Sequence, residues 1–118
     1  MEKKLEKTDL DQFTGTECYY KYMGGIKFTD GVKYLAEVGK AFWFLNIIAS
    51  YQAGKIKNIP FQVWTLEVDI EKQTGVVTMK EDSDRPNLVT QTLGYTDFPL
   101  DKISVWLIDG ILILPSEY

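Results

Sequence analysis

Glu67 and Asp69 are the residues whose type and spacing come nearest to those of a catalytic pair. They stand on the polar side of an alternating stretch that predicts a β-strand, where residues two apart are neighbours on one face. Paired carboxylates can divide the acid and base roles of a hydrolase, provided that one is withdrawn from water. Asp97 is the third candidate catalytic residue. An ordinary solvent-facing strand explains Glu67 and Asp69 more simply, so catalysis is the less favoured interpretation.

The chain has no histidine and a single cysteine, Cys18. Histidine is the commonest general base, the usual partner of a serine or cysteine nucleophile, and the commonest nitrogen ligand of zinc. This composition excludes the classical nucleophilic triads and zinc sites. Gly24–Gly25 lacks the lysine of a P-loop and the spacing of a dinucleotide fingerprint. We therefore expect no metal site and no cofactor.

Composition and charge limit the classes of partner. The 118 residues are 45% hydrophobic and 25% charged, which fits one domain over residues 1–118. The net charge is −4 and no basic stripe is present, so we expect no nucleic-acid partner. No apolar run approaches the ~18 residues of a membrane helix, and the first residues lack the apolar core of a secretory signal. With one cysteine, which suits a reducing compartment, we expect a cytoplasmic protein that does not bind membranes.

The periodicity of the apolar residues predicts an α+β domain, with a central helix packed on an antiparallel sheet. The helix covers about residues 40–53, a run without Gly or Pro that Gly54 ends. The sheet consists of hairpins and a meander, over about residues 26–35, 61–70, 76–81, 88–95 and 104–114. Residues 1–12 alternate Lys and Glu around two leucines and predict a surface helix or a frayed arm.

Asp-Gly pairs occur twice between apolar runs, at Asp30-Gly31 and at Asp109-Gly110. A two-residue type I′ turn needs positive φ at both positions, which Asp tolerates and Gly adopts freely. Both pairs are therefore predicted to be hairpin turns, with structural and not catalytic roles. At the first pair an alternative stays open, in which Thr29 or Asp30 caps a helix over residues 32–38.

The central helix carries a narrow, weakly polar stripe that predicts a binding surface. At about 100° per residue, Asn46 and Ser50 fall on this stripe, and Phe42 and Trp43 flank it. Large aromatic side chains of this kind often anchor interfaces. The candidate binding surface therefore consists of Phe42, Trp43, Asn46 and Ser50.

The hairpin around Asp109-Gly110 is apolar on both faces. Val105, Leu107, Leu112 and Leu114 share one side, and Trp106, Ile108, Ile111 and Ile113 share the other. Because neither side suits water, we expect the central helix to cover one face. The amino-terminal segment or a partner chain would cover the other.

Short segments spread along nearly the whole chain carry a family resemblance. They are Phe13–Glu17, Phe28–Glu37, Ile48–Gln52, Phe61–Leu66, Tyr95–Leu100, Leu107–Gly110 and Leu114–Tyr118. Together they resemble a family of small uncharacterised bacterial proteins that also occurs in phage and plasmid sequences, a domain of unknown function. The resemblance implies no activity, cofactor or catalytic residue. It does imply an accessory protein of a mobile element.

Three hypotheses about function follow. The first is a non-catalytic binding protein of a mobile element, which binds and modulates a host protein such as a defence component. The second is a small carboxylate-based hydrolase or small-ligand-binding protein that uses Glu67, Asp69 and Asp97. The third is a homodimeric scaffolding protein, joined through the outer face of the second hairpin or the Phe42–Trp43 edge. The missing histidine and the aromatic residues beside the polar stripe favour the first, so a protein partner or self-association is expected.

Overall fold

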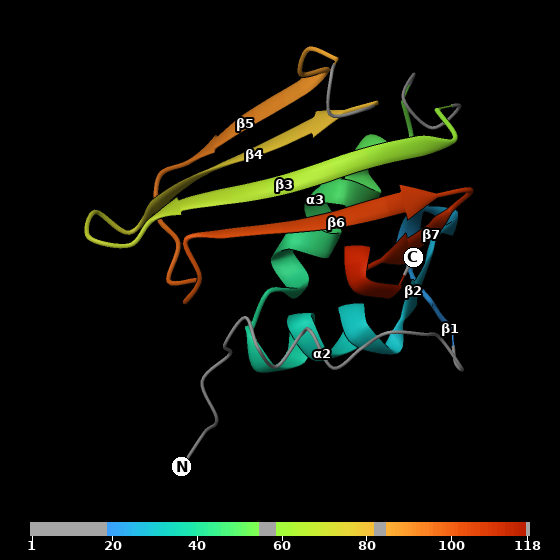
Figure 1. The fold of residues 1–118 in the computed structure, drawn as a ribbon, viewed down its shortest axis with the longest axis horizontal. Helices are drawn as coiled ribbons and strands as arrows, with labels where there is room; N and C mark the ends of the chain where they lie inside the picture. Colours follow the sequence, from blue (N-terminus) through green and yellow to red (C-terminus); the bar gives the residue numbers. More distant parts are fainter. Residues whose placement is uncertain (1–18, 55–58, 82–84, 118) are drawn as a thin grey trace.

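The computed structural model describes residues 19–54, 59–81 and 85–117 (Figure 1). The arm predicted at residues 1–12 lies outside these ranges, as does Cys18. The described elements, in which η marks a 3₁₀-helix, are β1 (Tyr19–Lys21), η1 (Met23–Gly25), β2 (Lys27–Thr29), α2 (Asp30–Val38), α3 (Phe42–Tyr51), β3 (Phe61–Asp69), β4 (Thr74–Lys80), β5 (Val89–Leu93), β6 (Lys102–Ile108), β7 (Ile111–Ile113) and η3 (Pro115–Glu117). The predicted α+β class is confirmed.

The described strands form one sheet in the order β1-β2-β7-β6-β3-β4-β5. Neighbouring strands pair antiparallel except β2 and β7, which run parallel with Phe28 opposite Leu112. β3, β4 and β5 form the predicted meander, and β6 pairs with the other edge of β3. A parallel pair needs a long crossover. Here the crossover contains the two described α-helices and four of the described strands, so β7, near the end of the chain, pairs with β2, which forms near its beginning.

The helix α3 forms the centre of the core and lies behind β3 and β6 in the view of Figure 1. Its buried side and the strand residues that face it pack into one apolar cluster, which includes Phe44, Leu45, Ile48, Trp64, Leu66, Val105, Leu107 and Leu112. The helix α2 packs beside α3 and contacts β2 and β7. The prediction of a central helix on a largely antiparallel sheet is therefore confirmed. The helix itself is shorter at both ends than the predicted range 40–53.

The prediction of a hairpin at residues 26–35 is wrong, because Asp30-Gly31 forms the start of α2 and not a turn between two strands. Thr29 is the N-cap, with extended backbone, and its Oγ1 accepts a hydrogen bond from the Val32 N–H at 3.3 Å. The Asp30 carboxylate accepts a hydrogen bond from the Tyr20 hydroxyl at 2.8 Å, which ties the helix start to β1. The alternative interpretation, a capped helix over residues 32–38, is the correct one.

The turn predicted at Asp109-Gly110 is confirmed. Asp109 has φ 50° and Gly110 has φ 84°, the positive values that a type I′ turn requires, and the turn joins β6 to β7. The Asp109 N–H donates to the Pro60 carbonyl at 2.9 Å, and the Gly110 carbonyl accepts from the Lys27 N–H at 2.9 Å. The turn therefore also holds the beginnings of β3 and β2.

The carboxylate of Glu117 lies against the amino-terminal end of α2. Its Oε1 accepts hydrogen bonds from the Thr29 hydroxyl at 2.6 Å and the Leu114 N–H at 2.9 Å. Its Oε2 accepts from the Gly31 N–H at 3.4 Å. A negative group is favoured at this end of a helix, where the first N–H groups have no intrahelical acceptor. The last turn of the described chain thus completes the cap of a helix that begins near its other end.

We expect Gly31→Ala to destabilise the protein. A Cβ at this position would lie 2.7 Å from both Glu117 Oε1 and Leu114 Cδ1, so the carboxylate would have to leave the cap. Loss of its charge-assisted hydrogen bonds outweighs the helix-propensity gain of ~1 kcal/mol, and the free energy of unfolding should fall by ~1–2 kcal/mol. Urea unfolding measures this change.

Gly94→Ala is the matched control, because nothing lies within 4 Å of a Cβ there. Its free energy of unfolding should change by less than ~0.5 kcal/mol. If both substitutions act on the same cap, adding Glu117→Ala to the Gly31→Ala variant should lower the free energy of unfolding only slightly further. Full additivity of the two substitutions would contradict this explanation.

Candidate functional site

The carboxylates Glu67 and Asp69 lie on the same side of β3, as the alternation predicts, and both are exposed. They line an open depression of about 810 Å³ whose wall also contains Asp101 and Lys102. Asp97 is exposed in the segment between β5 and β6 and does not line this depression. The structure therefore brings together two of the three predicted carboxylates and adds Asp101. Neither Glu67 nor Asp69 has the desolvated environment that a general acid needs.

Within the described ranges, no group of three or more His, Cys, Asp or Glu side chains is placed to hold a metal ion. The depression beside Glu67 thus presents separate carboxylates and one ammonium group to solvent.

The predicted stripe on α3 is exposed, at Phe42, Asn46 and Ser50. Phe42 keeps 38% of its surface accessible. The fourth predicted residue, Trp43, is half-buried and packs against the core, with its ring 6.1 Å from that of Phe44. The stripe is therefore placed as predicted, whereas Trp43 contributes mainly to packing.

A second element, η1, completes this surface. Tyr22 precedes it, and its ring stacks on that of Phe42 with 6.4 Å between centroids and 26° between planes. The Tyr22 hydroxyl donates a hydrogen bond to Asn46 Oδ1. Met23 is 58% exposed, among the highest values for the large apolar side chains described. We call the group Tyr22, Met23, Phe42, Asn46 and Ser50 the α3–η1 surface.

Gly24 allows η1 to lie this close to α3. It has φ 76°, and a Cβ at this position would lie 2.9 Å from the Ala49 carbonyl oxygen. A side chain would therefore push η1, and Tyr22 with it, away from the helix. On sequence alone the Gly24–Gly25 pair serves to exclude phosphate-binding motifs. The pair also signals a close approach of two backbones, and this signal could have added Tyr22 and Met23 to the surface.

A buried network of amide groups fixes the other end of α3 to the sheet. Gln52 and Gln62 exchange two hydrogen bonds, with Gln52 Nε2 donating to Gln62 Oε1 at 3.0 Å and Gln62 Nε2 donating to Gln52 Oε1 at 3.1 Å. Trp64 Nε1 also donates to Gln62 Oε1 at 2.9 Å. Both glutamines line a cavity of about 440 Å³ between η1 and the Asp109-Gly110 turn. Because the two glutamines hydrogen-bond each other, their main role is to stabilise the fold.

The face of the sheet opposite α3, which we call the outer face, carries the second apolar side of the β6–β7 hairpin. Its residues Trp106, Ile108, Ile111 and Ile113 are half-buried, as are Phe61 and Val63 beside them on β3. The opposite side of the hairpin, facing the helices, is fully buried at Val105, Leu107, Leu112 and Leu114. The prediction of a covered face is thus confirmed for the helical side. Side chains on the outer face keep part of their surface accessible.

A family model for a family of unknown function, DUF6876, matches residues 4–118. The chain belongs to the DUF6876 family. The resemblance to a family of unknown function is thereby confirmed over nearly the whole length, whereas the bacterial, phage or plasmid origin stays a prediction. No curated protein and no solved structure significantly matches the chain.

Among the described elements of this DUF6876 chain, no helix has the length and apolar character needed to cross a membrane. Two of the segments that carry the family resemblance, Phe28–Glu37 and Leu114–Tyr118, supply the residues of the α2 cap. These two segments therefore meet at the start of α2.

We expect Gln62→Leu to be strongly destabilising. It removes the partner of the buried Trp64 Nε1 and Gln52 Oε1, whereas Gln52 Nε2 keeps its hydrogen bond to the Ile48 carbonyl, and unsatisfied buried groups cost ~1–3 kcal/mol each. The free energy of unfolding from urea titration should fall by ~2–4 kcal/mol.

Gln91→Leu is the control, since Gln91 is half-buried and accepts a bond from the Tyr51 hydroxyl at 3.0 Å. Its cost should stay below ~1.5 kcal/mol. A double-mutant cycle of Gln52→Leu and Gln62→Leu should give a coupling energy of ~1 kcal/mol or more. A coupling near zero would show that the two amides do not act as a pair.

Proposed function

We propose that the protein is a non-catalytic binding protein that engages a protein partner through the α3–η1 surface. The observation that carries this proposal is that the exposed Phe42 stacks on Tyr22, whose hydroxyl bonds Asn46, with the exposed Met23 next to Tyr22 in the chain. Apolar anchors next to directed hydrogen-bonding groups are the composition of interface centres. The mobile-element role and the modulation of a host protein remain part of the proposal and rest on the family resemblance.

The surface is ordered before any partner binds. The Tyr22 ring is held on one side by Phe42 and on another by Phe28, whose ring it meets edge-on at 5.5 Å. Its hydroxyl is directed by Asn46, and the Ser50 hydroxyl donates to the Ile47 carbonyl at 2.7 Å. Side chains that are already fixed lose little conformational entropy on binding. Met23 adds a flexible, polarizable group that can adapt to the shape of a partner.

A small-ligand-binding protein is the second candidate, favoured by the depression lined by Glu67, Asp69, Asp101 and Lys102. Both signs of charge are present, so a zwitterionic or cationic polar molecule matches its lining. No hydrolytic step is assigned to it, because the predicted pair Glu67 and Asp69 is exposed.

The binding proposal is tested by truncating the anchors. Met23→Ala and Phe42→Ala should each weaken partner binding by roughly thirtyfold or more, the change expected of a ~2 kcal/mol hot spot. Affinity capture with the wild-type chain nominates partners, and calorimetry with a purified partner measures the dissociation constant.

Tyr95→Ala is the matched control, because Tyr95 is 68% exposed and lies outside the surface. It should leave the dissociation constant unchanged, and circular dichroism should show all three variants folded. Equal loss of binding in Tyr95→Ala, or full binding by Met23→Ala and Phe42→Ala, would contradict the proposed surface.

The second candidate predicts a thermal shift with zwitterionic or cationic compounds such as amino acids, and none with anionic nucleotides. A ligand present at ~100 times its dissociation constant stabilises the folded chain by ~2.7 kcal/mol. The shift should disappear in Glu67→Gln and persist in Glu37→Gln, where the substituted residue lies on α2. No shift with any compound removes this candidate and leaves the binding proposal standing.

A further inference from the structure

The outer face of the sheet is organised in rows that run across the strands. Residues paired between neighbouring strands share a face, so each register pair continues a row. One row contains Ile111, Ile108 and Phe61, and the next contains Ile113, Trp106, Val63 and Lys80. The third contains Ser104, Thr65, Thr78 and Thr90, and the fourth contains Lys102, Glu67, Val76 and Thr92.

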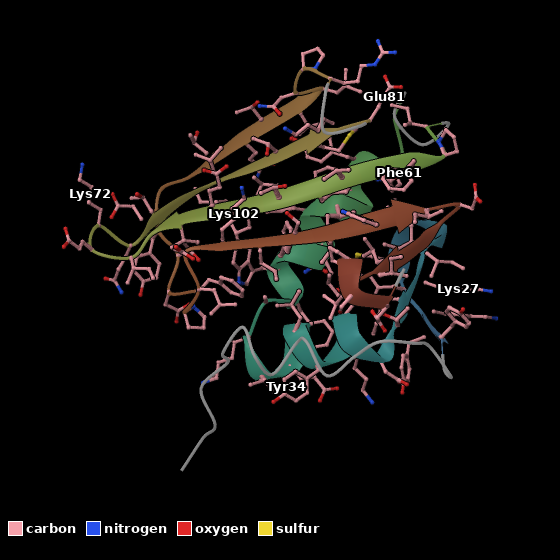
Figure 2. All side chains as sticks on the ribbon, in the orientation of Figure 1. Lys27, Tyr34, Phe61, Lys72, Glu81 and Lys102 are labelled. Carbon is pink, nitrogen blue, oxygen red and sulfur yellow. The ribbon has the colours of Figure 1, made fainter. Side chains whose placement is uncertain are left out.

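The character of the face changes from one end of the strands to the other. The first two rows are apolar along β7, β6 and β3, with the rings of Phe61 and Trp106 5.4 Å apart. The third row is a line of hydroxyl groups, in which Thr65 Oγ1 and Ser104 Oγ are 3.1 Å apart and hydrogen-bonded. The fourth places Lys102 directly opposite Glu67, both exposed. Figure 2 shows Phe61 and Lys102 at opposite ends of the β3–β6 pair.

We propose that the outer face binds a second copy of this chain, with the two sheets packed face to face. The two-fold axis runs along the strands between β3 and β6. Each row then meets the same row of the other copy, while the strand order is reversed, so β6 of one copy lies over β3 of the other. Aligned packing of two sheets is a common architecture, and an isologous contact must match a patch with itself.

This arrangement is complementary in shape. The large Trp106 faces the small Val63 of the second copy, and the same contact recurs on the other side of the axis. Ile108 faces Phe61 of the second copy in the adjacent row. Alternation of large and small side chains across facing layers allows them to interdigitate.

The arrangement is also complementary in charge. Lys102 faces Glu67 of the second copy, and Glu67 faces Lys102 of the second copy, which gives two opposite-charge contacts at the solvent-accessible end. Shifting the axis by half a strand spacing, onto β3, would place Glu67 over its own symmetry mate and set like charges against each other. The position of the charges therefore selects both the partner and the register.

The self-association surface is separate from the α3–η1 surface. The outer face lies on one side of the sheet, and α3 covers the other. A dimer would present two α3–η1 surfaces, both pointing away from the contact, and could bind a multivalent partner with higher avidity. Failure of one proposal leaves the other intact.

Sedimentation equilibrium tests the proposal. The wild type should approach twice the chain mass of 13.6 kDa with increasing concentration. Glu67→Lys and Lys102→Glu should each weaken self-association by about tenfold or more, because each sets two like-charge contacts across the axis. Glu37→Lys on α2 is the control for a change of net charge and should associate like the wild type.

Mixing the two single variants gives the decisive result. A Glu67→Lys chain presents two positive groups and a Lys102→Glu chain two negative groups, so the mixture should form a heterodimer more readily than either variant self-associates. A contact confined to one chain could not produce this rescue. A monomeric wild type at all concentrations, or no rescue in the mixture, would overturn the proposal. So would a dimer that Phe42→Ala abolishes and Glu67→Lys leaves unchanged.

Discussion

The contact between Glu117 and the start of α2 is the interaction on which the rest of the structure depends. The Thr29 hydroxyl donates to Glu117 Oε1 and accepts from the Val32 N–H, so one group joins the helix cap to the end of the chain. The same carboxylate holds the Leu114 N–H directly after β7. This fixes β7 alongside β2, the one parallel pair in the described sheet. Because β7 also pairs with β6, the cap sets the position of β1 and β2 relative to all the other strands.

This contact also explains where sequence reasoning failed. Asp30-Gly31 and Asp109-Gly110 have the same local chemistry, and a type I′ turn and a capped helix both suit Asp-Gly after a threonine or an apolar run. At Asp109-Gly110 the two apolar arms decide the outcome locally. At Asp30-Gly31 the deciding partner is Glu117, 86 residues away from Gly31. No window of neighbouring residues contains that information, and tertiary contact overrides the local preference.

The candidate binding surface also has one part that the sequence predicts and one part that depends on tertiary contacts. The exposed stripe Phe42, Asn46 and Ser50 follows from the 3.6-residue period of one helix, and the sequence predicts it correctly. Tyr22 and Met23 belong to another element, whose place depends on Gly24 meeting Ala49. The helical wheel places Trp43 beside the stripe and so predicts that it belongs to the surface, yet Trp43 is half-buried against the core. A helical wheel orders the residues of one helix and says nothing of what packs beside them.

The strand β3 connects the two proposed surfaces, because its successive side chains point to opposite faces of the sheet. Gln62 points to the helical side and bonds Gln52 at the end of α3, whereas its neighbour Val63 belongs to the outer face. The buried amide pair therefore fixes α3 to the strand that would form the centre of a dimer contact. Rotation of α3 on the sheet would break the two hydrogen bonds between Gln52 and Gln62. The α3–η1 surface and the outer face are thus held in one fixed relation. In a dimer this rigidity fixes the distance between the two α3–η1 surfaces. That distance determines which multivalent partners can bind both surfaces at once.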